Sequence, residues 1–251
     1  NQATINPHQN SMKLKRQAIL GIDTNSKTIK GVVRGYSTGI VYLAPSNESG
    51  RNTCPNASKG CRVACLFSAG RGSMSNVKKA RIKKTKNFFA NKTEWLGQLL
   101  EEIDRENRKA TKNGLTFVGR LNGTSDIAWE NFNVFQSRKD VQFYDYTKSF
   151  PRMLQYLDNA LPSNYHLTFS KSETNSKLCS LVLQRGGNVA MVFRNYEAVV
   201  AAGFYKFDGK TYPVIDGDKN DLRFLDPANC IVALKEKGEA KNDETGFVIT
   251  D

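Results

Sequence analysis

Short apolar segments alternate with polar clusters through the second half of the chain, and this alternation constrains the fold most. The apolar segments are residues 115–121, 141–146, 166–169, 188–193, 214–215 and 230–234. Stretches of helical composition separate several of them, near residues 149–160, 174–185 and 195–202. Strands that alternate with helices are joined by right-handed crossovers into a mostly parallel sheet. The sequence therefore predicts an α/β protein with a partial, mostly parallel (β/α) barrel of the TIM-like type.

The chain is expected to form one large domain. Its 251 residues, 39% of them hydrophobic, are enough for a single α/β barrel. Residues 1–35 are assigned to an N-terminal tail and β extension, because residues 13–44 have the composition of β structure. Residues 36–251 are assigned to a single α/β domain.

Three of the five cysteines, Cys54, Cys61 and Cys65, fall within the loop 54–65, between a strand and a basic helix. Thiolates are preferred ligands of zinc and of iron–sulfur clusters, and a disulfide would leave one thiol over. The spacing predicts a metal or cluster site without naming the metal. The alternative is a tight turn with small buried thiols. The other two cysteines, Cys179 and Cys230, are expected in the core.

Polar residues fall where the predicted strands end. A parallel barrel brings the carboxyl ends of its strands to one face, where barrel enzymes build their sites. We therefore expect the cysteine loop to converge with residues 124–126 and with the polar residues that close the next strands. The candidates for acid–base or metal-dependent catalysis are Asp126, Asp145, Lys148 and Glu173. His166 is a candidate fourth ligand if the metal is zinc.

The net charge is +13, from 37 Lys and Arg against 24 Asp and Glu. Such an excess favours nucleic acid or another polyanion as a partner, through phosphate neutralisation. The candidate contacts lie on or just before a predicted helix at residues 75–91, which a second helix at 93–112 follows. They are Arg62, Arg71, Lys78, Lys79, Arg81, Lys83, Lys84 and Lys86.

We expect a cytoplasmic location in the host cell. The polar start, residues 1–10, lacks the apolar segment of a signal peptide. No apolar run approaches the roughly 18 residues that a membrane span needs. We therefore expect no membrane partner.

Several segments, in the same order along the chain, resemble a phage-encoded family of the "gene product eighty-eight" type. The resemblance runs from about residue 36 to 248 and implies a phage or prophage origin and action inside an infected bacterial host. It implies no particular activity. The segments that carry it are residues 43–46, the cysteine loop 54–65 with Gly70-Arg-Gly, and residues 120–127, 143–148, 167–173 and 216–227.

The order of a strand, a three-cysteine loop and a parallel strand–helix series is similar to the radical S-adenosylmethionine (SAM) architecture. This resemblance implies that Cys54, Cys61 and Cys65 hold a [4Fe-4S] cluster, whose fourth iron site would hold SAM. It also implies that the loop of Gly123, Thr124, Ser125 and Asp126 binds the cosubstrate. Here Gly-Thr-Ser-Asp stands where that superfamily commonly has Gly-Gly-Glu.

The leading hypothesis is a phage iron–sulfur protein, radical-SAM-like, that acts on or with nucleic acid or nucleotides. The alternative is a non-enzymatic, basic nucleic-acid-binding phage protein with a structural zinc ion or a plain cysteine turn. A third hypothesis is a metal-dependent nuclease that uses Asp126, Asp145 and Glu173. The residues alone leave both an enzyme and a binding protein open.

Overall fold

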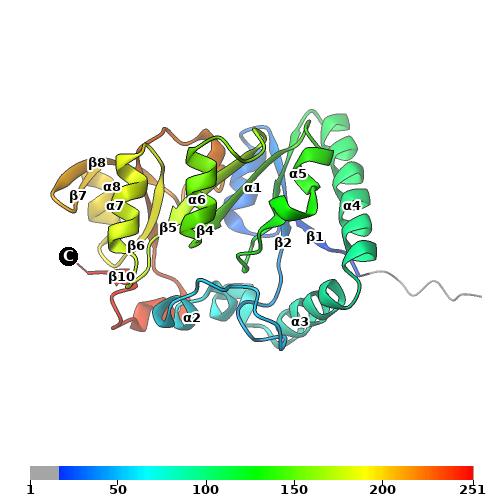
Figure 1. Ribbon diagram of the computed structural model, residues 1–251, viewed down its shortest axis with the longest axis horizontal. Coiled ribbons are helices and arrows are strands. Elements are labelled where there is room, and N and C mark those ends of the chain that lie inside the picture. The colour runs from blue at the N-terminus through cyan, green and yellow to red at the C-terminus, as the bar shows by residue number, and fades with distance from the viewer. Residues whose placement is uncertain (1–16, 251) are drawn as a thin grey trace, which may run out of the picture.

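The computed structural model describes residues 17–250 and contains a ten-stranded, mostly parallel sheet with the order β1-β2-β3-β4-β5-β6-β9-β8-β7 (Figure 1). Neighbours from β2 to β8 in that order pair in parallel, whereas β1 and β7 are antiparallel to β2 and β8, and β10 adds to β6. The strands are β1 (Leu20–Ile22), β2 (Tyr36–Val41), β3 (Thr116–Arg120), β4 (Gln142–Thr147), β5 (Tyr165–Ser170), β6 (Val189–Phe193), β7 (Phe204–Phe207), β8 (Lys210–Asp216), β9 (Ile231–Lys235) and β10 (Val248–Ile249). The predicted α/β class and mostly parallel sheet are confirmed, and within the described residues the sheet is open rather than closed into a barrel.

Helices connect the parallel strands where the sequence predicts them, at α3, α4, α6, α7 and α8. The helices are α1 (Ser26–Val32), α2 (Lys59–Val63), α3 (Ser75–Ala90), α4 (Lys92–Lys112), α5 (Val134–Ser137), α6 (Phe150–Leu157), α7 (Ser176–Gln184) and α8 (Tyr196–Ala202). The stop after α4 is also as expected, because Gly114 has a positive φ of 71°. None of the helices within residues 17–250 has the length and apolarity of a membrane span.

The N-terminal region differs from the prediction. Residues 27–36 are β-branched enough to suggest a strand, but residues 26–32 form helix α1. Asn25 caps this helix: its side chain accepts hydrogen bonds from the backbone N–H groups of Lys27 and Thr28, and the Thr28 hydroxyl accepts from the Asn25 N–H. This reciprocal capping box fixes a helix start and outweighs the β propensity that follows it. Only β1 remains of the predicted β extension, and residues 1–16 lie outside the described residues.

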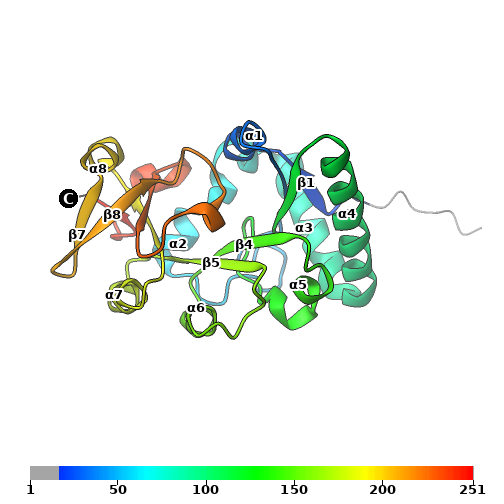
Figure 2. The same cartoon turned by 90° about the horizontal axis from the view of Figure 1, so that it is seen from above.

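The two faces of the sheet are covered differently. Figure 2 shows a curved sheet with α4, α5, α6 and α7 on its outer side and the segment 217–229, in orange, on its inner side. The outer face and its helices form the main apolar core. On the inner face Leu222 and Phe224 pack against Val118 and Tyr144. The helix face therefore supplies most of the core, and the inner face is closed by one irregular segment.

Candidate metal centre

The cysteine loop leaves the carboxyl end of β2 and crosses the same edge of the sheet at which β3, β4 and β5 end. Figure 1 shows α2 and α3 along this edge, together with the C-terminal segment that ends in β10. Cys54 precedes α2, Cys61 lies within it, and Cys65 follows it. All five cysteines of the chain are free thiols; these three are half-buried, whereas Cys179 and Cys230 are fully buried in the core as expected.

The loop after β3 holds the first cysteine in place. The Asp126 N–H donates to the Thr53 carbonyl (2.8 Å), and the Thr53 hydroxyl donates to the Ala44 carbonyl (2.7 Å). The Cys54 thiol itself lies 3.7 Å from the Thr124 carbonyl oxygen. Cys54 is therefore fixed between the carboxyl ends of β2 and β3.

Glu173, in the loop after β5, holds the second and third cysteines through α2. Its carboxylate accepts from the Ser58 hydroxyl (2.6 Å) and from the Gly60 N–H (2.7 Å), at the start of α2. Ser58 also caps this helix by accepting from the Cys61 N–H (3.2 Å). A Cβ on Gly60 would lie 2.3 Å from the Thr245 hydroxyl, so only glycine fits between Glu173 and the C-terminal segment.

The three thiols are close enough to influence one another's ionisation. Burial, together with the neighbouring Cys61 and Cys54, raises the pKa of Cys65 to about 11, although the Phe67 backbone and the Lys148 ammonium favour the thiolate. Burial likewise raises the pKa of Cys54. Because a metal binds thiolates, any metal that binds here must displace protons from these thiols.

Two cations stand beside the thiols. The Arg81 guanidinium lies over the Tyr42 ring at 4.6 Å from its centroid. Burial lowers the Arg81 pKa, and the nearby Tyr42 and Cys65 offset part of that lowering. Arg81 Nη1 is buried and has no hydrogen-bond partner among residues 17–250. Lys148 directly follows β4, and its Nζ lies 5.5 Å from the centre of the Phe247 ring.

The side chains of the predicted cosubstrate loop already have partners. The Thr124 hydroxyl donates to the Leu43 carbonyl (2.6 Å), and the Ser125 hydroxyl donates to the Asn122 side chain (2.9 Å). Gly123 lies against β2, where a Cβ would come within 2.7 Å of the Ile40 and Tyr42 side chains. The role of this loop in binding a cosubstrate stays a prediction.

The predicted catalytic carboxylates are engaged as well. Asp126 accepts from the Thr147 hydroxyl (2.8 Å), from the Lys148 N–H (2.9 Å) and from Arg152 (2.6 Å). Asp145 is fully buried on the helix side of β4, where it accepts from the Asn122 N–H (2.7 Å) and from the Tyr165 hydroxyl (3.1 Å). The structure thus brings Asp126, Lys148 and Glu173 to the edge of the sheet that the cysteine loop crosses. Asp145 lies within β4, below that edge. Their catalytic roles stay predictions.

The predicted nucleic-acid contacts divide into two groups. Lys78, Arg81 and Lys84 are half-buried; Lys84 Nζ donates to the Ile19 carbonyl (2.5 Å), and burial lowers its pKa to about 8. Lys78 Nζ lies 5.3 Å from the centre of the Phe67 ring. The others face outward from α2 and α3 and the turn between them, and are Arg62, Arg71, Lys79, Lys83 and Lys86.

His166 is not a partner of the cysteines. It lies at the start of β5, the opposite edge of the parallel sheet, where Nδ1 hydrogen-bonds with the Tyr156 hydroxyl (2.8 Å). Burial lowers its pKa to about 4. The expectation of a Cys₃His site is therefore wrong, because strand direction separates the histidine from the thiols by the length of β5.

Sequence reasoning missed the residues that organise the edge. Asn122 accepts hydrogen bonds at Oδ1 from Ser125 Oγ, the Ile127 N–H and Trp129 Nε1, and so shapes the loop that fixes Cys54. Arg152 binds both Asp126 and Glu130. The position of Asn122 directly after an apolar strand could have indicated its role. The role of Arg152 could not be predicted, because it depends on contacts between distant segments.

A family model described as Gene product 88 matches residues 12–251. Among curated proteins and solved structures, none matches the chain.

Proposed function

The chain belongs to the Gene product 88 family, and for this phage protein we propose that Cys54, Cys61 and Cys65 bind a [4Fe-4S] cluster in a radical-SAM-like enzyme that acts on or with nucleic acid or nucleotides. The observation that carries the proposal is the grouping of three free thiols on one loop, at the carboxyl edge of a parallel sheet. That edge is where α/β proteins build their sites. The consecutive parallel strands β2 to β6 also support the partial-barrel arrangement that such an enzyme would have.

A cluster and a single ion need ligands at different separations. Within residues 17–250 no three His, Cys, Asp or Glu side chains are grouped to hold one metal ion. Thiolates around one zinc ion, each about 2.3 Å from it, would lie less than about 5 Å apart. A cluster places each thiolate on a different iron atom, so its ligands stand further apart than the ligands of a single ion.

The charges around the thiols also fit a cluster. Three thiolates bring negative charge into a half-buried site, and Arg81 and Lys148 supply positive charge beside Cys65. The Arg81 Nη1 donor, buried without a partner among the described residues, would have an acceptor in a thiolate or sulfide. Hydrogen bonds and charge near the sulfurs are what tune such clusters.

When bound, a [4Fe-4S] cluster would supply one-electron transfer, and with SAM it would supply the radical chemistry of the superfamily that the chain resembles. The residues of the chain would hold and orient this cluster. The three cysteines would hold the cluster, Glu173 and the Thr53–Asp126 contact would orient their loop, and Arg81 and Lys148 would stabilise the thiolates.

The proposal is tested by measuring iron and sulfide, with the visible absorption spectrum, after anaerobic purification of the full chain. We expect about four irons per chain and broad absorption near ~400 nm. Cys61→Ala should lose both, whereas the matched control Cys179→Ala, which removes a core thiol, should keep both. Equal iron in the two variants, or none in the wild type, would exclude the site. SAM cleavage by the iron-loaded protein is the assay for the enzyme.

A second candidate is the non-enzymatic nucleic-acid-binding protein, and the exposed cations of α3 favour it. Stoichiometric zinc in place of iron, with salt-dependent nucleic-acid binding and no SAM cleavage, would support this candidate over the first. We make no proposal for a nuclease, because Asp126, Asp145 and Glu173 are each engaged by backbone or side-chain donors.

A further inference from the structure

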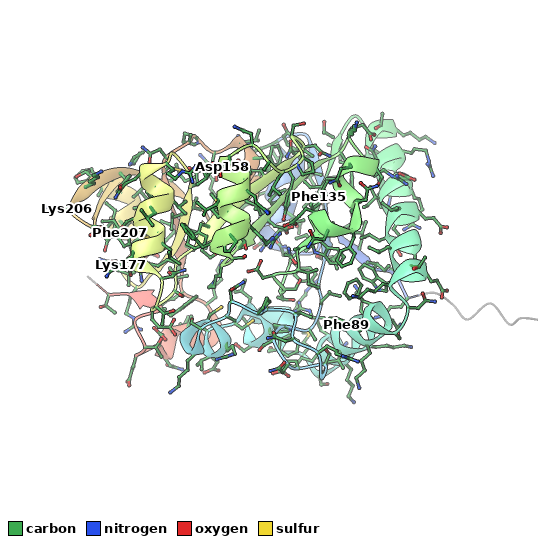
Figure 3. All side chains as sticks on the ribbon, in the orientation of Figure 1. Phe89, Phe135, Asp158, Lys177, Lys206 and Phe207 are labelled. Carbon is green, nitrogen blue, oxygen red and sulfur yellow. The ribbon has the colours of Figure 1, made fainter. Side chains whose placement is uncertain are left out.

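A groove of about 400 Å³ lies beside the cysteine loop, between that loop and the junction of α3 with α4. Its volume is within the range of small-molecule sites. Phe88 lies in the groove, buried to 1% exposure, and the half-buried Phe89 and Phe132 also line it. Figure 3 labels Phe89 near the end of α3 that leads into α4. The groove therefore offers aromatic rings to a ligand.

Cations surround these rings. Lys92 Nζ lies 5.6–5.8 Å from the ring centres of Phe88, Phe89 and Phe132, and the Arg51 guanidinium lies 5.9 Å from that of Phe89. Both cations are exposed. Such cation–π contacts hold the charged groups at the rim of the groove.

The acid that lines the groove is bound by hydrogen-bond donors. Asp126 is the acid among the described lining residues, and Arg152 and the Lys148 N–H bind its carboxylate. The amides of Asn52 and Asn56 also line the groove. The groove therefore combines flat apolar rings and amide groups with the exposed cations Arg51 and Lys92 at its rim, which suits a ligand with aromatic bases and phosphates.

We propose that this groove binds single-stranded nucleic acid, with an unpaired base against Phe89 and Phe132 and adjacent phosphates on Arg51 and Lys92. A duplex keeps its bases stacked and offers only phosphates, so half-buried rings select an unpaired strand. Lys86 lies exposed one turn before Phe89 on α3 and extends the positive surface away from the groove. Single-stranded nucleic acid would then be the substrate class of the proposed enzyme. Any reaction on the strand rests on that proposed function, whereas binding of the strand needs no cluster.

The test is fluorescence anisotropy of the full chain with labelled single-stranded DNA and RNA of about 15 nucleotides, and with a hairpin duplex of matched composition. We expect the single strand to bind at least tenfold more tightly than the duplex. Phe89→Leu keeps apolar volume but removes the aromatic face, and should weaken binding about tenfold. Lys92→Gln should weaken binding several-fold and reduce the salt slope by about 0.7.

The matched control is Lys112→Gln, which removes an exposed charge at the far end of α4 and should bind as the wild type does. Circular dichroism checks that each variant is folded. Equal affinity for duplex and single strand, or wild-type binding by folded Phe89→Leu, would overturn the groove assignment. The absorption spectrum of each sample reports the cluster separately. Strand binding without iron would overturn the proposed enzyme and support the groove as a binding site. Iron without strand binding would support the cluster and overturn the groove assignment.

Discussion

Asp145 shows at the residue scale how a buried carboxyl group links stability to pH. Burial raises its pKa to about 7, although the Asn122 N–H, the charges of Arg120 and Arg152 and the Tyr165 hydroxyl favour the ionised form. Between the unfolded pKa of about 4 and this value, the native state binds a proton that the unfolded state has released. Stability from this group is therefore lost as pH rises through that window.

We expect the free energy of unfolding to fall by up to about 4 kcal/mol between pH 4 and pH 7 because of Asp145. Asp145→Asn should remove this slope, because an amide does not titrate. Urea denaturation of both proteins across this pH range is the measurement. Parallel curves for the two proteins would mean that Asp145 ionises normally in the folded chain.

Residue types alone predicted which side chains carry chemistry but not what each one touches. The three clustered cysteines were found from their spacing, and the two core cysteines were assigned correctly. Lys84 belongs to the same run of lysines as Lys83, yet it points inward to Ile19 while Lys83 is exposed. Which lysines of a basic helix turn inward depends on the elements that pack against it, and no local pattern encodes that.

At the scale of elements, α2 is too short to be stable alone and depends on Glu173 from another loop. Burial opposes ionisation of Glu173, but the hydrogen bonds from Ser58 and Gly60 outweigh burial and hold its pKa below the usual value. The stabilisation is therefore present above the unfolded pKa of about 4.3 and is lost as pH falls through the lowered folded value.

Glu173→Gln should lower the free energy of unfolding by about 1 kcal/mol at pH 7, because a charge-assisted cap becomes a neutral one. The difference from wild type should shrink toward pH 3. Chemical denaturation at the two pH values measures both effects, with Glu244→Gln as the control at an exposed carboxylate. A variant as stable as wild type at pH 7 would show that Glu173 does not anchor α2.

The elements themselves were largely predictable. The helices α3 and α4 and the strands β3 to β6 follow from periodicity and from strand-then-loop composition. Helix α1 was missed because its Asn25 cap was overlooked beside β-branched residues. Of β8 only residues 214–215 were predicted, and β7 and β10 were missed, because the β7–β8 hairpin is largely exposed at the sheet edge and β10 is a two-residue strand.

At the scale of the whole molecule, the segment 217–229 closes the inner face of the open sheet through a buried ion pair. Arg120 Nη1 lies 2.9 Å from Asp221 Oδ2, and both side chains are largely buried. Burial opposes ionisation of Asp221, but Arg120 outweighs it and holds the Asp221 pKa below the usual value. Within the same segment Arg223 Nη1 lies 3.3 Å from Asp226 Oδ2. The pairing of Asp221 with Arg120 could not be predicted from sequence, because a contact between β3 and a loop about a hundred residues later has no local signature.

Arg120→Met should cost about 3–5 kcal/mol of stability, since it leaves the buried Asp221 carboxylate without its partner. Adding Asp221→Asn should recover more than half of that loss, because the amide is neutral and still accepts from the Tyr144 hydroxyl. Thermal and urea unfolding of the single and double variants measure the coupling. Additive losses in the double variant would contradict a direct ion pair between the sheet and the segment.

The central claim is that three thiols at the carboxyl edge hold an iron–sulfur cluster, and X-ray absorption at the iron and zinc edges tests it most directly. The sample is the full chain, purified without oxygen, beside a variant in which Cys54, Cys61 and Cys65 are all serine. We expect iron with sulfur ligands and iron–iron scattering in the wild type, and no iron in the variant. Zinc alone with sulfur ligands, or no metal in the wild type, would contradict the claim.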